Sequence, residues 1–130
     1  MFPTLTLVGS TKFPNVWKEQ LKCCTLDGYI VHTVGLFGHV ENLDMSGKVK
    51  HMLDEMYQQK IFQSDSIFVL NTNGYIGMGA WDEILFALAY DKHIYFLESE
   101  IPYFSDLCNL AKLEDKEYLI HNCKPPHLRS

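Results

Sequence analysis

Two acidic residues, Asp82 and Glu83, stand just after a glycine-rich stretch that runs from Asn71 to Gly79. A carboxylate at such a place is a candidate for catalysis, since carboxylates transfer protons and act as nucleophiles. The helix dipole also favours acids in the first turn of a helix, so a structural role is the competing interpretation. Four residues of the stretch are expected to contact a ligand: Asn71, Tyr75, Gly77 and Gly79.

A second group of candidate residues follows a short β-rich run at the start of the chain and comprises Gly9, Ser10, Thr11 and Lys12. These residues offer backbone N–H groups, two hydroxyls and an ammonium just before a predicted helix. That combination can bind an anion such as phosphate. An ordinary turn with a capping hydroxyl explains the same residues, so both interpretations stay open.

A third candidate segment, residues 35–45, is long for a connection between a strand and a helix. Loops of that length are usually functional or mobile. Gly35 and His39 lie in it. His39 could act as a general acid or contact a phosphate, and a solvated loop histidine is the alternative.

Hydrophobic patterning places these three segments at the ends of predicted strands. Strands are expected over residues 4–8, 29–34, 66–70 and 93–97, and helices over 14–26, 46–63, 80–90 and 106–113. This alternation predicts an α/β fold with a Rossmann-like, doubly wound parallel sheet of four to five strands and flanking helices. Ligands of such sheets bind outside the carboxyl ends of the strands. We expect residues 1–98 to form this core and residues 99–130 to form a C-terminal helix and tail packed on it.

Composition limits the partners of the chain. Its 130 residues carry a formal net charge of −5, which argues against a DNA or RNA binder because that role needs a basic surface. No apolar run reaches membrane-spanning length, and the first residues lack signal-peptide features. The four cysteines form no C-x-x-C pair, and the His and Cys residues near the C-terminus match no standard zinc spacing. We therefore expect a cytoplasmic protein without a metal or a cofactor.

Three motifs together resemble one enzyme superfamily. They are the strand that leads into Gly9-Ser-Thr, the run Ser64-Asp-Ser-Ile-Phe-Val69, and the run Gly79-Ala-Trp-Asp-Glu83-Ile-Leu-Phe-Ala87. They look like the nucleoside 2-deoxyribosyltransferase superfamily, which includes the 2′-deoxynucleoside 5′-phosphate N-hydrolases. With residues 34–39 and 74–77 added, the similarity to uncharacterised bacterial and phage members extends to Glu98, about three quarters of the chain.

The resemblance implies cleavage of a nucleoside N-glycosidic bond through a glutamate nucleophile. The glycine-x-x-x-glutamate spacing maps that nucleophile onto Glu83, and the phosphate-binding loop of the family maps onto residues 9–12. The sequence departs from the family at four positions, where the tyrosine of the first strand, the second carboxylate, the phosphate-binding serine and a glycine after the nucleophile are replaced by Thr6, Tyr57, Gly77 and Leu85. Asp54, one helical turn before Tyr57, or Asp82 could supply the second carboxylate.

Two functions are consistent with this pattern. The first is cleavage or transfer at the N-glycosidic bond of a (deoxy)nucleoside or a nucleoside 5′-monophosphate. The alternative is a non-catalytic sensor or sequestering protein that binds a nucleotide-like ligand. The missing tyrosine and second carboxylate favour the alternative, and the retained Glu83 favours the enzyme.

Members of the superfamily commonly form homodimers or larger assemblies, so a homodimer is expected here. The third predicted helix has an apolar face centred on Trp81, Ile84, Leu85 and Leu88. Phe86 and Tyr90 fall on the opposite side, and we expect these aromatic residues to form part of the interface.

Overall fold

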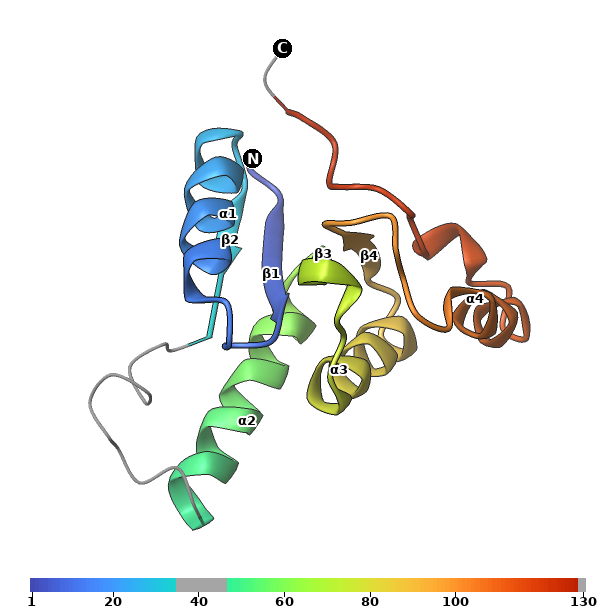
Figure 1. Ribbon diagram of the computed structural model, residues 1–130, viewed down its shortest axis with the longest axis horizontal. Helices are drawn as coiled ribbons and strands as arrows, with labels where there is room; N and C mark the ends of the chain where they lie inside the picture. Colours follow the sequence, from blue (N-terminus) through green and yellow to red (C-terminus); the bar gives the residue numbers. More distant parts are fainter. Residues whose placement is uncertain (35–46, 129–130) are drawn as a thin grey trace.

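Short runs rich in aliphatic and β-branched residues form four parallel strands, and amphipathic segments between them form helices (Figure 1). The computed structural model describes residues 1–34 and 47–128. Its strands are β1 (Thr4–Gly9), β2 (Ile30–His32), β3 (Ser66–Leu70) and β4 (His93–Phe96), and its helices are α1 (Pro14–Leu26), α2 (Gly47–Gln63), α3 (Met78–Ala89) and α4 (Phe104–Lys112). Two 3₁₀ turns, η1 (Thr72–Gly74) and η2 (Glu117–Leu119), complete the elements. No described helix is long and apolar enough to cross a membrane.

The strands form one sheet in the order β2-β1-β3-β4, and every pair is parallel. The predicted Rossmann-like α/β fold is therefore confirmed. Beyond β4, Ile120 forms a single parallel bridge with Ile94. Two backbone hydrogen bonds flank this bridge, from His121 N–H to the Ile94 carbonyl at 2.9 Å and from Phe96 N–H to the Cys123 carbonyl at 3.0 Å. Residues 120–123 thus occupy the place of a fifth strand.

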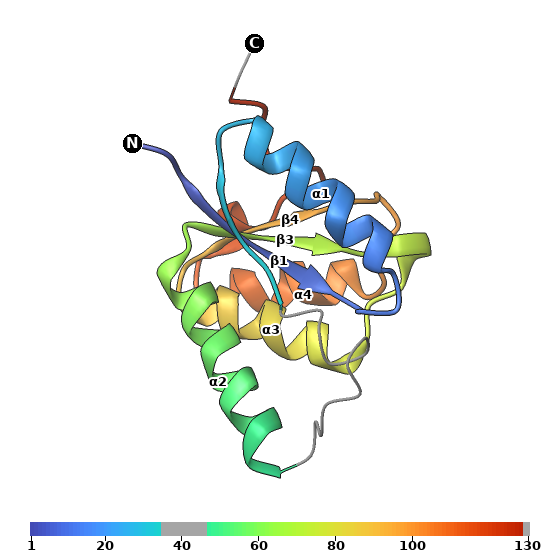
Figure 2. The same cartoon turned by 90° about the vertical axis from the view of Figure 1, so that its left-hand side faces the viewer.

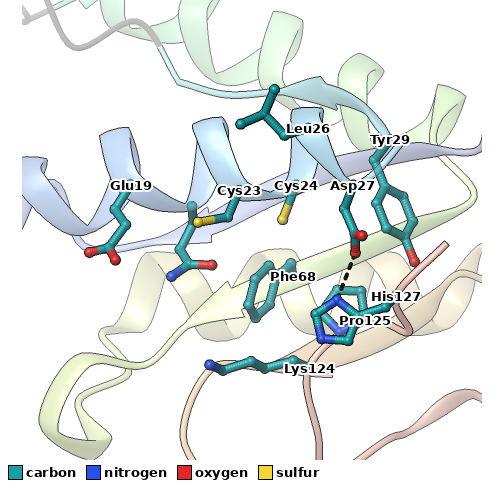
Figure 3. Close-up of a pocket in the computed structure, with 11 residues that line it drawn as sticks. Glu19, Cys23, Cys24, Leu26, Asp27, Tyr29, Phe68, Lys124, Pro125 and His127 are labelled. Carbon is teal, nitrogen blue, oxygen red and sulfur yellow. Dashed lines mark hydrogen bonds and ion pairs between the residues drawn. The ribbon is translucent and has the colours of Figure 1, made fainter. Parts of the chain in front are cut away.

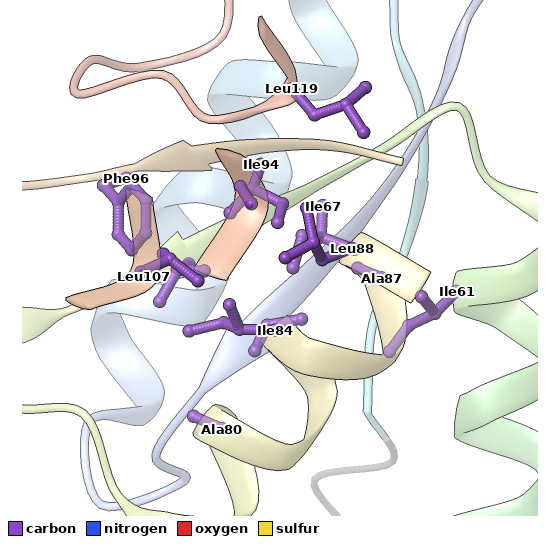
Figure 4. Packing of buried hydrophobic residues seen from close by; sticks show 13 residues of the cluster. Ile61, Ile67, Ala80, Ile84, Ala87, Leu88, Ile94, Phe96, Leu107 and Leu119 are labelled. Atoms are coloured by element: carbon purple, nitrogen blue, oxygen red, sulfur yellow. The ribbon is translucent and has the colours of Figure 1, made fainter. Parts of the chain in front are cut away.

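Helices cover both faces of the sheet, α1 on one and α2, α3 and α4 on the other (Figure 2). Side chains alternate along a strand, so Leu5 and Leu7 of β1 pack against Trp17 of α1, whereas Val8 joins the opposite core. Figure 4 shows that second core, where Ile84 of α3 lies against the sheet with 0% exposure. Burial of each such side chain stabilises the fold by about 1.5–3 kcal/mol.

The helices that follow the two central strands cover opposite faces of the sheet. β1 leads into α1 on one face, while its neighbour β3 leads into α3 on the other. The carboxyl edge beside such a topological switch point is where ligands of doubly wound proteins bind.

Two details differ from the predicted elements. The third helix begins at Met78, and its buried residues are Ala80, Ile84, Ala87 and Leu88, so placing Leu85 at the centre of the apolar face was wrong. Leu85 is 42% exposed because α3 turns Ile84 and its buried neighbours toward the sheet, and this face is rotated by about one residue from the predicted face. The second strand covers only Ile30–His32 of residues 29–34.

Candidate functional site

The first loop and the glycine-rich loop meet at the switch point between β1 and β3. The ammonium of Lys12 lies 4.8 Å from the centre of the Tyr75 ring, in a cation–π arrangement. Both side chains are exposed. The structure therefore brings together two candidate ligand-binding residues that are separated by more than 60 positions in the sequence.

The first loop is held in shape by its own backbone and by α1. Gly9 has φ +156°, and a Cβ added there would lie 3.1 Å from the Leu70 carbonyl oxygen, so glycine permits the close approach of β1 and β3. The Ser10 hydroxyl accepts a hydrogen bond from the Lys12 N–H at 3.2 Å, and the Trp17 indole donates to the Ser10 carbonyl at 2.9 Å. These bonds fix a turn in which Thr11 and Lys12 precede α1.

The glycine-rich loop folds around the Tyr75 side chain. A Cβ at Gly77 would lie 3.1 Å from the Tyr75 hydroxyl, so a side chain at this position would displace the phenol. Gly79, in the first turn of α3, has no atom within 4 Å of such a Cβ and faces open space. Gly77 therefore shapes the site through Tyr75, whereas Gly79 keeps the start of α3 accessible.

Asn71, the third polar candidate of this loop, is buried. Its side chain is 0% exposed, and Nδ2 donates to the carbonyls of Glu98 and Glu100, each at 3.0 Å. Its Oδ1 accepts the Glu98 N–H at 2.9 Å. Asn71 thus joins the end of β3 to the segment after β4, and a direct contact with a ligand would require this clamp to open.

The Asn71 clamp leads to a prediction about stability. Asn71→Ala is expected to lower the free energy of unfolding by about 2–3 kcal/mol, because three hydrogen bonds are lost and buried backbone groups are left without partners. Urea denaturation followed by circular dichroism measures this change. The control, Asn109→Ala on the exposed side of α4, should shift stability by less than about 0.5 kcal/mol. Equal effects of the two variants would contradict the clamp.

Glu83 lies on α3 with its carboxyl group largely withdrawn from solvent. Its Oε2 is buried and has no hydrogen-bond partner within the part of the chain that the structure describes. Burial, together with the negative charges of Asp54 and Asp82, raises the pKa of Glu83 to about 8, and hydrogen bonding to Tyr57 opposes this rise. A buried carboxyl with an unsatisfied oxygen is a typical feature of a functional site.

Tyr57, on α2, connects this carboxyl group to the sheet. Its hydroxyl donates to the carbonyl of Leu7, which lies one residue beyond the last β1–β2 pair, Thr6 with His32. Burial and the Glu83 charge raise the pKa of Tyr57 well above its usual value, so the phenol keeps its proton. A phenol has one proton to donate, so the Tyr57 hydroxyl donates a hydrogen bond either to the Leu7 carbonyl or to the ionised Glu83 carboxylate.

The second half of α2 also contacts the backbone directly after the short β2 strand. The Lys60 ammonium donates to the Thr33 carbonyl at 2.8 Å, directly after the strand ends. Thr6 of β1 is 0% exposed, and its hydroxyl hydrogen-bonds to the Ser64 hydroxyl at 2.6 Å. Thr6 therefore anchors the end of α2 through a buried hydroxyl.

Asp54 and Asp82 are the two candidates for the second carboxylate, and their negative charges raise the pKa of Glu83. Asp54 forms an ion pair with Lys50 at 2.9 Å, and its side chain is 63% exposed. Asp82 is exposed on α3. Gly35 and His39 lie outside the described residues. Within residues 1–34 and 47–128, no group of three or more His, Cys, Asp or Glu side chains could hold a metal ion.

A hollow that local sequence patterns did not predict lies on the opposite face of the sheet. This hollow of about 610 Å³ lies between α1 and residues 124–127, with Phe68 at its floor (Figure 3). Cys24 lines it and is 7% exposed, and burial raises the pKa of the Cys24 thiol to about 11. Cys23 and Cys24 both line this hollow, but two adjacent cysteines in a sequence do not indicate a cavity.

The parallel strands in the order β2-β1-β3-β4, with helices on both faces, define a Rossmann-like α/β protein. No family model and no curated protein matches the chain. Among solved structures, it is similar to a conserved protein from Enterococcus faecalis V583, with a TM-score of 0.53 and 16% sequence identity. The match covers 93% of this chain and 80% of the other. At this identity the similarity supports the fold alone.

Proposed function

We propose that this protein cleaves or transfers at the N-glycosidic bond of a (deoxy)nucleoside or nucleoside 5′-monophosphate, with Glu83 as the nucleophile. The observation that carries the proposal is the buried Glu83 carboxyl, whose Oε2 lacks a hydrogen-bond partner among the described residues. It lies on the helix that follows the glycine-rich loop at the carboxyl edge of the sheet.

In the proposed reaction, an oxygen of ionised Glu83 forms a bond to the anomeric carbon while the bond from that carbon to the base breaks. The electron pair of the broken bond leaves with the base, which takes up a proton. Water then releases the sugar from Glu83, or a second base replaces water and completes a transfer. The negative charges of Asp54 and Asp82 would stabilise the positive charge that develops on the sugar ring.

Ligand binding without turnover is the second candidate function. The raised pKa of Glu83, about 8, favours it, because most Glu83 carboxyls are then neutral at pH 7 and a neutral carboxyl is a poor nucleophile. Thr6 and Tyr57 also leave the site without the family's tyrosine and second carboxylate. A sensor or sequestering protein needs neither group.

Incubation with a panel of nucleosides and nucleoside 5′-monophosphates, followed by chromatography for free base, separates the two functions. Release of base supports the enzyme. Binding detected by calorimetry without release supports the sensor or sequestering protein. If no member of the panel is cleaved or bound, both proposals fail.

The first loop gives a prediction about the ligand. Replacing both Ser10 and Lys12 by alanine is expected to weaken binding of a nucleoside 5′-monophosphate by about 1–3 kcal/mol, the range for charge-assisted hydrogen bonds. Binding of the matching nucleoside should change far less, because it lacks the phosphate. Calorimetry with both ligands measures the difference. Equal losses for the two ligands would show that the loop does not recognise phosphate.

We place the protein in the cytoplasm, as its thiols suggest. Cys23, Cys24, Cys108 and Cys123 are all free. Free thiols are typical of a reducing compartment.

A further inference from the structure

A groove between α3 and α4 combines aromatic and aliphatic side chains with one carboxylate. Both helices pack on the same core, on the face of the sheet opposite to α1 (Figure 2). The groove has a volume of about 380 Å³, within the range of sites that bind small molecules. This α3–α4 groove is lined by Trp81 and Leu85 of α3, by Tyr103, and by Asp106, Leu107 and Leu110 of α4.

The α3–α4 groove is separate from the candidate site around Glu83. Trp81 and Leu85 each stand two residues from Glu83 along α3. At about 100° per residue, both therefore lie on the side of the helix opposite to Glu83. The groove is a second place where a ligand can bind, and the proposed reaction does not use it.

Two aromatic rings meet at a steep angle in this groove. The ring centres of Trp81 and Tyr103 lie 6.3 Å apart, and the ring planes make an angle of 69°. A cation in the corner between them can lie within about 6 Å of both centres, which is the range of cation–π attraction. Tryptophan attracts cations more strongly than the other aromatic residues do. The corner between the two rings therefore favours a positively charged group.

The position of Tyr103 is not explained by burial. Its side chain is 72% exposed, and its backbone is left-handed with a φ of 56°. The other described residues with positive φ, glycines aside, are Asn73, Asp91 and Asp115. Asn and Asp tolerate this conformation because their short polar side chains bond locally, whereas tyrosine lacks such a side chain. Residues held in this way cluster at ligand sites.

Asp106 supplies a negative charge to the same groove. Its side chain is exposed, and none of the ion pairs among the described residues includes it. The helix dipole favours an acid in the first turn of α4, which is a structural reason for Asp106. The dipole does not account for the aromatic pair beside it. The carboxylate and the two rings are independent features, and both attract positive charge.

A quaternary ammonium ion fits this combination of aromatic rings, aliphatic side chains and one carboxylate. Its charge is spread over methyl groups, which can contact the leucines while the rings and Asp106 attract the charge. A primary ammonium is compact and strongly hydrated, so it loses more on leaving water. We propose that the α3–α4 groove binds a small molecule that carries a quaternary ammonium group. The proposal is independent of the proposed function.

Calorimetry with choline and with 3,3-dimethyl-1-butanol tests the role of the charge. The two molecules have the same shape, but a neutral carbon replaces the quaternary nitrogen in the second. Choline should bind, and the neutral molecule should bind at least about tenfold more weakly, because cation–π attraction requires the charge. Equal binding of the two molecules, or no binding of choline at millimolar concentration, would overturn the proposal.

Substitutions of exposed residues test the walls of the groove with little risk to the fold. Asp106→Asn and Tyr103→Leu should each weaken choline binding at least about threefold, whereas Tyr103→Phe keeps the ring and should bind as the wild-type protein does. The matched controls are Asp115→Asn and Tyr118→Leu, which change an exposed acid and an exposed tyrosine on other elements. Equal losses in the controls would contradict the site.

Fluorescence locates the bound cation. The chain has two tryptophans, and Trp17 is 1% exposed beneath α1 on the other face of the sheet. Choline should therefore change the emission of Trp81 alone, and Trp81→Phe should abolish the response. A response that persists in Trp81→Phe would place the ligand outside the α3–α4 groove.

Two further probes distinguish the sources of a quaternary ammonium group. A peptide with trimethyl-lysine presents the group on a protein, and vesicles of phosphatidylcholine present it on a membrane. Neither should bind more tightly than choline, because the groove has the volume of a small-molecule site. Clearly tighter binding of the peptide or the vesicles would assign the groove to a protein or a membrane and overturn the proposal.

Discussion

Glu83→Gln is expected to abolish release of free base from a substrate that the wild-type protein cleaves, with a fall in rate of about 10³-fold or more. The amide has the shape of the carboxylic acid but cannot form the glycosyl bond that the proposed reaction requires. Most of the ligand affinity should remain, because the first loop and Tyr75 are untouched. Chromatographic assay of free base and calorimetry of ligand binding give the two readouts.

An exposed glutamate on another element supplies the control for this experiment. Glu117, in the 3₁₀ turn before the C-terminal segment, is exposed, and Glu117→Gln should leave base release unchanged. Asp54→Asn and Asp82→Asn then show which neighbouring carboxylate contributes. Base release by Glu83→Gln at the wild-type rate would exclude Glu83 as the nucleophile.

The same substitution should stabilise the protein at alkaline pH. Below about pH 4.5 Glu83 is protonated in both the folded and the unfolded chain, and its burial has no pH-dependent cost. Between pH 4.5 and about 8 the unfolded chain loses this proton while the folded protein keeps it, so the free energy of unfolding falls as pH rises. A pKa difference of this size corresponds to a loss on the order of 5 kcal/mol above pH 8. Glu83→Gln carries no such penalty.

Urea denaturation of the wild-type and Glu83→Gln proteins at pH 4.5, 7 and 9 measures this effect. The variant should be close to the wild-type protein at the lowest pH and progressively more stable than it at the two higher values. Glu117→Gln should follow the wild-type protein throughout. A stability difference that does not change with pH would mean that the folded protein ionises Glu83 normally.

Local sequence patterns were sufficient to predict the order of strands and helices. The alternation of apolar strands and amphipathic helices gave the parallel sheet, and β3 matched its predicted residues. The end of β2 could not be predicted from local patterns, because it depends on Lys60, which binds the Thr33 carbonyl from a helix 27 positions away. The exposed position of Leu85 depends on how α3 is rotated against the sheet, and periodicity alone did not determine this rotation.

The candidate site was likewise predictable from the sequence only in part. That the first loop and the glycine-rich loop would meet followed from the topology, because parallel strands end at a common edge, and the contact of Lys12 with Tyr75 agrees with it. The burial of Asn71 could not be foreseen, since its partners lie 27 and 29 positions away. The contact of Tyr57 with Glu83 could not be predicted from local patterns either, because the two residues belong to different helices.

The way the sheet is closed at its two borders has a consequence for aggregation. An open strand edge is a template for another chain, and many proteins aggregate through such edges. Residues 120–123 already hydrogen-bond to the outer side of β4, and β2 offers only three residues on the other side. Past the end of β2, the side chains of Tyr57 and Lys60 occupy carbonyl oxygens that an incoming strand would need. Concentrated solutions of this protein should therefore resist fibril formation by strand addition, and contacts between copies are left to its helices.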